Sequence, residues 1–496
     1  MNYQIRAPRP SFIPHLSTLL ILLLLLALSG CGIRRTPDLE RIFAAARERK
    51  DKRPIIVIPG ILGSQLVNRR TGEVVWPSLL FHSAGQSLRL PTTPDLASNR
   101  DDLIATRIVE TAKLVRLTPE IYVYYQLLDA LRRYGGYHDG NWDNPGPDGD
   151  RDTFYVFAYD WRRDNVETAR ELMQRIEELK TRLHRPDLRF NIVAHSMGGL
   201  IARYAAMYGD RDLPAGDSSP QPTWAGASAI NKVFMFGTPN EGSAEAFATL
   251  IDGYSVTEGL RRRIRLFSNL SRDDALTIPS LFELLPDSAA TRFLDENLAP
   301  VAIDLYDPAV WKRYGWSAIT DPAYRERVAH HAESPPLSAH DPYSLGDLDA
   351  YFAAVLKRAK LFHESLDATS DTKQASVALF AFGGDCEETL AAPIILHDEK
   401  SGRWITLITP RAFHTSTDHY VSRAEATRAM YEPGDGRVTR RSLLGETLAA
   451  RRGSALFDTA LPIAYAVFAC DVHSELQNNK TLQDNALTLL VSEAIK

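Results

Sequence analysis

Hydrophobic residues occur along this chain as short apolar runs, separated by longer segments in which apolar and polar positions alternate with a helical period. Continuous runs of this kind, rich in β-branched residues, predict strands that are buried on both faces, as in a parallel sheet. Alternation of such strands with helices predicts an α/β fold with a mostly parallel central sheet and helices on both faces. The expected strands are residues 55–58, 154–158, 190–194, 233–236, 377–382, 394–396, 404–408 and 463–469, and the expected helices are 119–133, 165–183 and 345–361.

The strand–helix alternation is interrupted twice. Residues 67–118 have mixed composition and no clear hydrophobic period, and we expect them to form a loop or flap over the functional site. Residues 244–370 are aromatic-rich with scattered prolines and helical patches, which indicates an inserted, largely helical cap. The predicted core therefore has two parts, residues 53–243 and residues 371–496.

The N-terminal segment has the features of a targeting signal. Arg6 and Arg9 precede the apolar stretch Leu19–Leu28, which is too short to span a bilayer. It ends in Leu28-Ser29-Gly30-Cys31, which resembles a bacterial lipobox. We expect residues 1–31 to be a lipoprotein signal peptide with Cys31 as the lipidation site and membrane anchor, followed by a charged tether at residues 32–52. An ordinary secretory signal or an uncleaved anchor is the alternative.

This signal predicts a location in the bacterial cell envelope. Gly32, directly after the cysteine, favours the outer membrane, facing the periplasm or the surface. Two cysteines remain, Cys386 and Cys470, each just after an apolar run. They could pair in an oxidising compartment, or they could be two buried thiols, and the sequence leaves both open.

Composition sets broad limits on function. The 496 residues are 44% hydrophobic and 24% charged, which is ordinary for a globular protein. The net charge of −5 gives no reason to expect a nucleic-acid partner. The oligomeric state is left open.

Residues 189–204 carry the strongest chemical signal. An apolar strand, Phe190–Ala194, leads into His195-Ser196-Met197-Gly198-Gly199 and then into a helix. A strand, a sharp turn with a serine at its tip and a helix form the nucleophile elbow of an α/β-hydrolase, although Ala194 replaces the usual glycine. We therefore expect Ser196 to be the nucleophile, and the N–H of Met197 to face the oxygen of a substrate carbonyl. The alternative is a chance strand–turn–helix with an idle serine.

Two other strand ends are candidates for the same site. The loop after residues 55–58 contains Gly60 and Gly63, and we expect the N–H of Leu62, or less favourably Ile61, to be the second oxyanion donor. The strand at 154–158 runs into Tyr159-Asp160-Trp161-Arg162. These side chains could shape a substrate pocket, or the Asp and Arg could brace the loop.

A serine needs a histidine to take its proton and a carboxylate to orient that histidine. In this fold the chain order is serine, acid, histidine. Asp435, in a glycine-flanked loop, and His473, just after the last strand, fit that order. Asp385 is an alternative acid, and His414 and His419 are alternative bases.

No metal or organic cofactor is expected for this chemistry. The acidic loop Asp139–Asp152 could hold calcium, but it lacks the ligand spacing of an EF-hand and is better explained as a solvated loop. The basic run Arg261–Arg265 could contact anionic lipid headgroups or be a solvated helix face.

Taken in order, these motifs resemble the lecithin–cholesterol acyltransferase family, which includes lysosomal phospholipase A2-like enzymes and phospholipid:diacylglycerol acyltransferases. The resemblance covers roughly residues 53–480 as separate islands. It implies a triad of Ser196, Asp435 and His473, with oxyanion donors at Leu62 and Met197. No cysteine occurs in residues 67–118, so the disulfide-bounded lid of the animal members is missing.

The resemblance implies a serine-dependent carboxylic ester hydrolase or acyltransferase that acts on phospholipids or other acylglycerols through an acyl-enzyme on Ser196. It leaves the acyl donor and acceptor open. The alternatives are an esterase, thioesterase or amidase for a non-lipid substrate, and a non-catalytic envelope-binding lipoprotein on the same scaffold.

Overall fold

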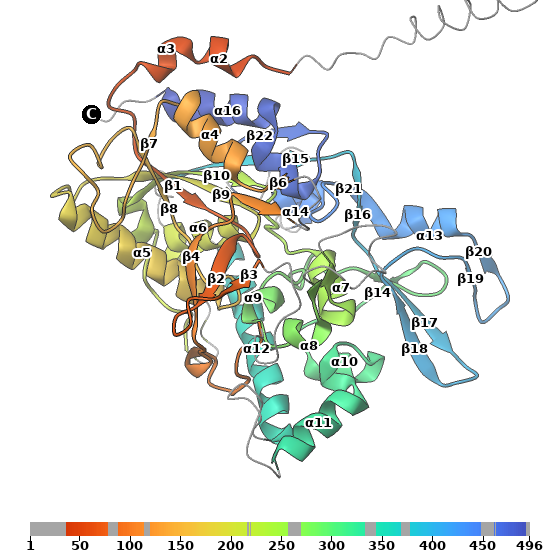
Figure 1. Ribbon diagram of the computed structural model, residues 1–496. Helices are drawn as coiled ribbons and strands as arrows, with labels where there is room; N and C mark the ends of the chain where they lie inside the picture. Colours follow the sequence, from red (N-terminus) through yellow and green to blue (C-terminus); the bar gives the residue numbers. More distant parts are fainter. Residues whose placement is uncertain are drawn as a thin grey trace, which may run out of the picture. The chain divides into compact units, whose positions relative to one another are not determined.

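Figure 1 shows the computed structural model, which describes residues 36–492 except 78–87, 114–119, 216–217, 219, 256–268, 333–343, 369–376, 448–460 and 462. The chain divides into the units Met1–Asp38 and Leu39–Lys496, and the second unit contains every described helix and strand. The predicted signal peptide, Cys31, the start of the tether and the basic run Arg261–Arg265 lie outside the described residues. None of the described helices is long and apolar enough to cross a bilayer.

The centre of the larger unit is a seven-stranded sheet in which every neighbouring pair of strands is parallel. The predicted α/β fold with a parallel central sheet is confirmed. All residues of the central strands β1 and β9 are buried, as expected for apolar runs covered on both faces. In spatial order the strands are β22 (Ile463–Ala469), β15 (Ala378–Gly384), β10 (Ile230–Phe236), β9 (Phe190–His195), β1 (Ile55–Ile58), β8 (Thr153–Val156) and β7 (His138–Asp139).

Helices cover both faces of this sheet (Figure 1). Successive side chains of a strand face opposite sides. Ile56 and Ile58 of β1 pack in one core cluster with side chains of α5 and α6, whereas Ile55 and Val57 pack in another with side chains of α4 and α16. The bounds of these helices are α4 (Tyr125–Arg133), α5 (Asn165–Arg182), α6 (Met197–Tyr208) and α16 (Lys480–Val491).

Helices predominate among the regular elements described between β10 and β15, which also include four two-residue strands. The buried side chains Phe282, Trp311 and Phe352 of this insertion belong to the same core cluster as Leu200 of α6. The insertion is therefore packed onto the sheet and its helices, while its role as a cap over the active site stays a prediction. Its helices are α7 (Ala244–Asp252), α8 (Arg272–Ala275), α9 (Pro279–Phe282), α10 (Pro308–Tyr314), α11 (Pro322–Ala332) and α12 (Leu345–Asp367).

The described part of the expected flap is more regular than its sequence pattern indicates. Antiparallel strands β2 (Ser64–Asn68), β3 (Val74–Trp76) and β4 (Leu103–Ile108) form a sheet in which Leu66 lies opposite Trp76 and Ala105. The helix expected from residue 119 begins only at Tyr125, because Glu120–Tyr122 (β6) pairs with Thr111–Lys113 (β5).

Beyond β15 the chain adds short antiparallel pairs. The predicted hairpin is present as β17 (Ile394–Asp398) and β18 (Arg403–Leu407). Strand β16 (Glu387–Leu390), directly after β15, pairs with β21 (Tyr431–Gly434). This second pair positions the loop that contains Asp435. The remaining elements here are β19 (Phe413–His414), β20 (Tyr420–Val421), α13 (Arg423–Met430) and α14 (Arg440–Leu444).

Candidate active site

Ser196 occupies a sharp turn between β9 and α6. Its backbone angles, φ 52° and ψ −126°, are unusual for a residue with a side chain and indicate a strained turn. Small residues allow this turn to pack. A Cβ atom on Gly198 would lie 2.6 Å from the Pro59 carbonyl oxygen, and one on Gly199 would collide with the side chain of Thr238. The strand–turn–helix predicted around Ser196 is present.

The structure brings Ser196, His473 and Asp435 together. Nε2 of His473 lies 2.9 Å from Oγ of Ser196, and Nδ1 lies 2.8 Å from Oδ2 of Asp435. The second carboxylate oxygen of Asp435 accepts hydrogen bonds from the backbone N–H groups of Arg437 and Val438, at 2.9 and 2.7 Å. These bonds fix the carboxylate, which is only 2% exposed. The arrangement matches the serine–histidine–acid geometry that activates a hydroxyl.

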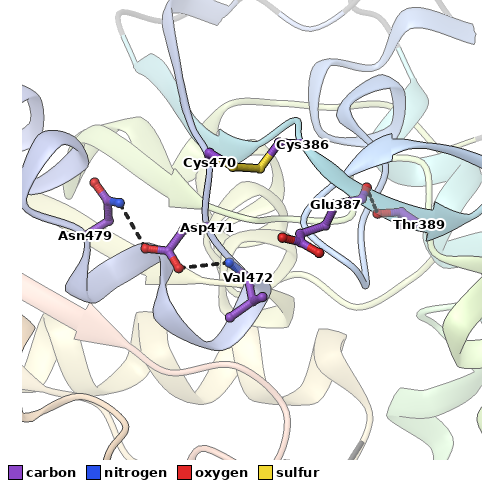
Figure 2. Close-up of a disulfide and its surroundings, with 7 residues drawn as sticks. All are labelled: Cys386, Glu387, Thr389, Cys470, Asp471, Val472 and Asn479. Carbon is purple, nitrogen blue, oxygen red and sulfur yellow. Dashed lines mark hydrogen bonds between the residues drawn. A yellow bond between two sulfur atoms is a disulfide. The ribbon is translucent and has the colours of Figure 1, made fainter. Parts of the chain in front are cut away.

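A disulfide links the end of β22, which leads into His473, to the connection between β15 and β16, and β16 pairs with the strand that precedes Asp435. Cys470 follows β22 and precedes His473 by three residues, and Cys386 lies between β15 and β16. Figure 2 shows the Cys386–Cys470 bond beside Asp471, whose carboxylate accepts hydrogen bonds from the Val472 N–H and the Asn479 amide. The backbone N–H of His473 also donates to the Asp435 carbonyl oxygen over 2.8 Å. The pairing that the sequence left open is therefore present in the structure.

The alternative acid and bases are elsewhere. Asp385 is exposed and lies next to Cys386, while Asp435 is the carboxylate that contacts His473. His414 and His419 lie in the β19–β20 hairpin, and Nδ1 of His414 faces Asp418 at 3.1 Å. The geometry therefore favours the triad expected from the order of residues along the chain. The catalytic roles of its three members stay a prediction.

The candidate oxyanion donors occupy suitable backbone positions. Met197 is the first residue of α6. The loop after β1 approaches the Ser196 turn so closely that a Cβ atom on Gly60 would lie 2.8 Å from Cβ of Ser196. Leu62, two residues later, has a positive φ of 64°, and its carbonyl oxygen accepts a hydrogen bond from the Trp76 indole over 2.8 Å. That bond orients the peptide, and the donor roles of Leu62 and Met197 stay predictions.

The segment Tyr159–Arg162 is bound to the surrounding framework. The Tyr159 hydroxyl donates to the Pro59 carbonyl oxygen over 2.9 Å, and the Trp161 indole donates to the Ser64 carbonyl oxygen over 3.2 Å. The guanidinium of Arg162 is fully buried and makes ion pairs with Asp160 and Asp101. These contacts are the bracing that the sequence offered as one alternative. A role in the substrate pocket stays a prediction.

Tyr124 and His195 are two residues whose part in this site the sequence does not reveal. The Gly60 N–H donates to the Tyr124 hydroxyl over 2.9 Å, which in turn lies 2.8 Å from Nδ1 of His195. Nε2 of His195 lies 3.0 Å from the carbonyl oxygen of His473. Burial lowers the pKa of His195 to about 3, with a further contribution from His473. The position of His195 beside Ser196 was the one available signal, and Tyr124 gave none beyond its place in a predicted helix.

The acidic loop at residues 139–152 uses its carboxylates in ion pairs. Asp139 contacts Arg132, Asp150 contacts Arg185, and Asp152 contacts the buried Lys52. Across the ranges that the structure describes, no group of three or more His, Cys, Asp or Glu residues could hold a metal ion. The three carboxylates therefore serve as ion-pair partners, and those of Asp150 and Asp152 are buried, whereas the sequence favoured a solvated loop.

A parallel sheet flanked by helices, with Ser196 on a tight strand-to-helix turn and His473 and Asp435 on later strand-end loops, defines an α/β-hydrolase. The family model described as Lecithin:cholesterol acyltransferase matches residues 146–314. This match includes the elbow with Ser196, and it confirms the resemblance that the sequence motifs indicate. The chain is an α/β-hydrolase similar to that family.

Solved structures give further comparisons. A chain in the crystal structure of the Tle4–Tli4 complex is 14% identical, with a TM-score of 0.53 over 90% of this chain and 100% of that one, and it confirms the fold. EstA from Clostridium botulinum is 14% identical over 90% and 89% of the two chains, with a TM-score of 0.32. Phospholipase PlaB from Legionella pneumophila is 20% identical over 27% and 24%, with a TM-score of 0.17. A search of curated proteins gives no match.

Proposed function

We propose that this protein is a serine esterase that cleaves carboxylic esters of phospholipids or other acylglycerols and passes the acyl group to water or to an alcohol. The observation that carries the proposal is the unbroken hydrogen-bonded series Ser196–His473–Asp435 at the ends of β9, β22 and β21. The match to the acyltransferase family model supports the acyl chemistry and the lipid class of substrate.

The geometry supports a two-step reaction. Nε2 of His473 takes the proton of Ser196 as Oγ attacks the ester carbonyl carbon, and Asp435 holds the Nδ1–H and stabilises the imidazolium. In this proposal the N–H groups of Leu62 and Met197 donate to the oxyanion of the tetrahedral intermediate. When that intermediate collapses, the ester C–O bond breaks, and the leaving alcohol takes the proton from His473. An acyl-enzyme on Ser196 remains.

The second step repeats the first with a new nucleophile. Water or an alcohol gives its proton to His473 and attacks the acyl carbonyl, and Ser196 leaves with that proton. Water yields a free fatty acid, and an alcohol yields a new ester. The residues of the triad serve both outcomes equally, so the choice depends on which molecule reaches the acyl-enzyme.

We also propose that Cys31 anchors the protein by lipid chains in the bacterial cell envelope, at the outer membrane. The lipobox-like Leu28-Ser29-Gly30-Cys31 and the short apolar stretch before it support this placement. Such an anchor would keep the site close to ester bonds of membrane lipids.

Product analysis tests the proposed activity. The full chain is reconstituted in phospholipid vesicles that contain a long-chain alcohol or sterol, and the lipids are identified by mass spectrometry beside a Ser196→Ala control. Free fatty acid that depends on Ser196 indicates a phospholipase or lipase, and an acylated alcohol indicates a transferase. Unchanged lipids with fluorophosphonate labelling of Ser196 would move the substrate to soluble esters, thioesters or amides. Absence of labelling would leave a non-catalytic envelope-binding protein.

A further inference from the structure

A chain of hydrogen bonds runs behind Ser196, from the loop after β1 to the backbone of His473. Its links are the Gly60 N–H to the Tyr124 hydroxyl, that hydroxyl to Nδ1 of His195, and Nε2 of His195 to the His473 carbonyl oxygen. The distances are 2.9, 2.8 and 3.0 Å. Tyr124 and His195 are 2% and 8% exposed, so a lost partner here is poorly replaced by water.

The backbone groups at the two ends of this hydrogen-bonded series fix the direction of the outer bonds. A backbone N–H can only donate, so the Tyr124 oxygen accepts from Gly60, and its own hydrogen finds an acceptor when Nδ1 of the buried, neutral His195 carries no proton. A carbonyl oxygen can only accept, so Nε2 of His195 must carry a hydrogen for the bond to His473. One arrangement satisfies all four groups: a neutral His195 with its proton on Nε2.

A neutral ring is also what the proposed reaction requires at this place. The rings of His195 and His473 are 4.9 Å apart between their centroids, and the proposed reaction makes His473 cationic. A second cation at that distance would raise the energy of the imidazolium. The groups that face His195 are the Tyr124 hydroxyl, His473 and Asp435, and burial keeps the pKa of His195 far below neutrality.

This series of hydrogen bonds also connects parts of the site whose separations the proposed reaction requires to stay fixed. Gly60 lies two residues before Leu62, the candidate oxyanion donor, and packs against Cβ of Ser196. His195 is the residue directly before Ser196. His473 is the candidate base. The oxyanion loop, the nucleophile and the base are thereby joined by two side chains that bond to each other and to backbone groups.

We propose that Tyr124 and His195 are positioning residues, which form a relay of fixed polarity that holds the loop bearing Leu62 and the backbone of His473 in register with Ser196. This proposal rests on the proposed function, since the relay acts by placing groups that the esterase reaction uses. The hydrogen bonds of the relay hold backbone segments in place, and the effect of that placement is measured as kcat.

Tyr124→Phe is the direct test, because it removes the hydroxyl and keeps the ring. We expect kcat for a soluble short-chain ester to fall on the order of 10- to 100-fold, with KM within about twofold, because misplaced reacting groups slow the chemical step more than they weaken binding. The matched control is Tyr155→Phe. Tyr155 is also buried, and its hydroxyl donates to the Gly149 carbonyl oxygen over 2.8 Å, outside the relay. The Tyr155→Phe variant should lose about as much thermal stability as Tyr124→Phe and should keep the wild-type kcat.

A second pair of variants separates positioning from folding. The amide of His195→Gln can donate to the His473 carbonyl oxygen, whereas His195→Ala can make no such bond. We expect His195→Gln to keep most of kcat and His195→Ala to lose most of it, with both variants assayed well below their melting temperatures, where each is folded. Equal kcat in these two variants, or a wild-type kcat in folded Tyr124→Phe, overturns the proposal.

Histidine 15N spectra keep this test separate from the proposed function. If fluorophosphonate fails to label Ser196 in the wild-type protein, the esterase proposal fails, and the relay is then decided by the state of His195. A neutral ring with its proton on Nε2 from pH 5 to 9, whose unprotonated Nδ1 resonance shifts in Tyr124→Phe because its hydrogen bond is lost, supports the relay. A charged ring, or a proton on Nδ1, overturns it.

Discussion

The carboxylate of Asp435 is bound on both oxygens, by the ring of His473 and by two backbone N–H groups. Asp435→Asn keeps the size of the side chain but removes the acceptor that holds the imidazole proton on Nδ1. We expect kcat to fall by roughly four orders of magnitude, as loss of the acid does in comparable triads. Ester hydrolysis by purified protein measures it.

The control for this substitution is Asp385→Asn, at the alternative acid position. Asp385 is exposed and lies beside the disulfide, so Asp385→Asn should leave kcat near the wild-type value. If Asp385→Asn abolished turnover while Asp435→Asn did not, the assignment of the acid would have to be exchanged.

At Gly199, in the first turn of α6, close packing leaves no room for a larger side chain. A Cβ atom there would collide with the side chain of Thr238. Gly199→Ala should therefore lower the free energy of unfolding by about 1–3 kcal/mol through overpacking. Gly346, in the first turn of α12, has open space, with only the Ser344 hydroxyl at 3.5 Å. Gly346→Ala should raise stability by up to about 1 kcal/mol. Denaturant titration of both variants checks the contrast, and destabilisation of equal size would contradict it.

At the scale of elements, the site depends on how β22 and the β16–β21 pair are held together. The Cys386–Cys470 bond closes a separation of 84 residues and links the end of β22 to the start of the β16–β21 pair, which leads into the loop with Asp435. Reduction should lower the free energy of unfolding by about 2–5 kcal/mol and lower kcat as well. Melting temperature and turnover with and without a reductant provide the measurement.

The double variant Cys386→Ser with Cys470→Ser is the control for this prediction. It should resemble the reduced protein and should not respond to the reductant. A reduced wild-type protein with unchanged melting temperature and unchanged kcat would show that the bond has no part in holding the two loops.

The elements that the sequence predicts well are those with local signals. The apolar runs of β1, β9 and β10 and the elbow around Ser196 each contain their own pattern, so the sheet and the turn that presents Ser196 follow from the residues alone. Asp435 and His473 could be chosen because chain order narrows the candidates.

Other features depend on contacts between distant segments and have no such signal. The strands of the β2–β3–β4 sheet are short and mix apolar with polar residues irregularly, so their sequences show no clear two-residue period. The start of α4 is set by β6 pairing with β5. Asp101, which pairs with Arg162, and His195, which contacts Tyr124, lie 61 and 71 residues away in the sequence, and the disulfide depends on β15 and β22 being neighbours.

At the scale of the whole molecule, buried histidines make stability depend on pH. Burial lowers the pKa of His363 to about 4, against 6.5 for a free histidine, with Asp287 opposing and Arg203 adding to the shift. Between pH 6.5 and 4, His363 is therefore protonated in the unfolded chain but stays neutral in the folded chain. Stability from this group is present above pH 6.5 and is lost as the pH falls toward 4.

His363→Gln isolates this effect from the other titrating groups. Between pH 6 and 4.5, the wild-type free energy of unfolding should fall more steeply than that of the variant, by up to about 1.4 kcal/mol per pH unit. Denaturant titrations at several pH values measure both slopes. Parallel slopes would mean that His363 titrates alike in the folded and unfolded chains.

The proposed anchor is also a property of the whole chain. Cys31→Ala should abolish incorporation of labelled fatty acid into the protein and move it out of the membrane fraction, because it removes the site at which lipid chains are attached. Fractionation of cells that produce each form checks this. Labelled fatty acid on the variant, or its unchanged recovery with membranes, would refute Cys31 as the anchor.

The order of the triad along the chain also has a consequence in time. His473 follows Ser196 by 277 residues and is placed by β22, at the edge of the sheet. A ribosome takes on the order of tens of seconds to add that length. Throughout that interval a nascent chain has Ser196 but not its candidate base. Under the proposed mechanism, the chain therefore gains the ability to attack an ester only once β22 has been made and has docked beside β15.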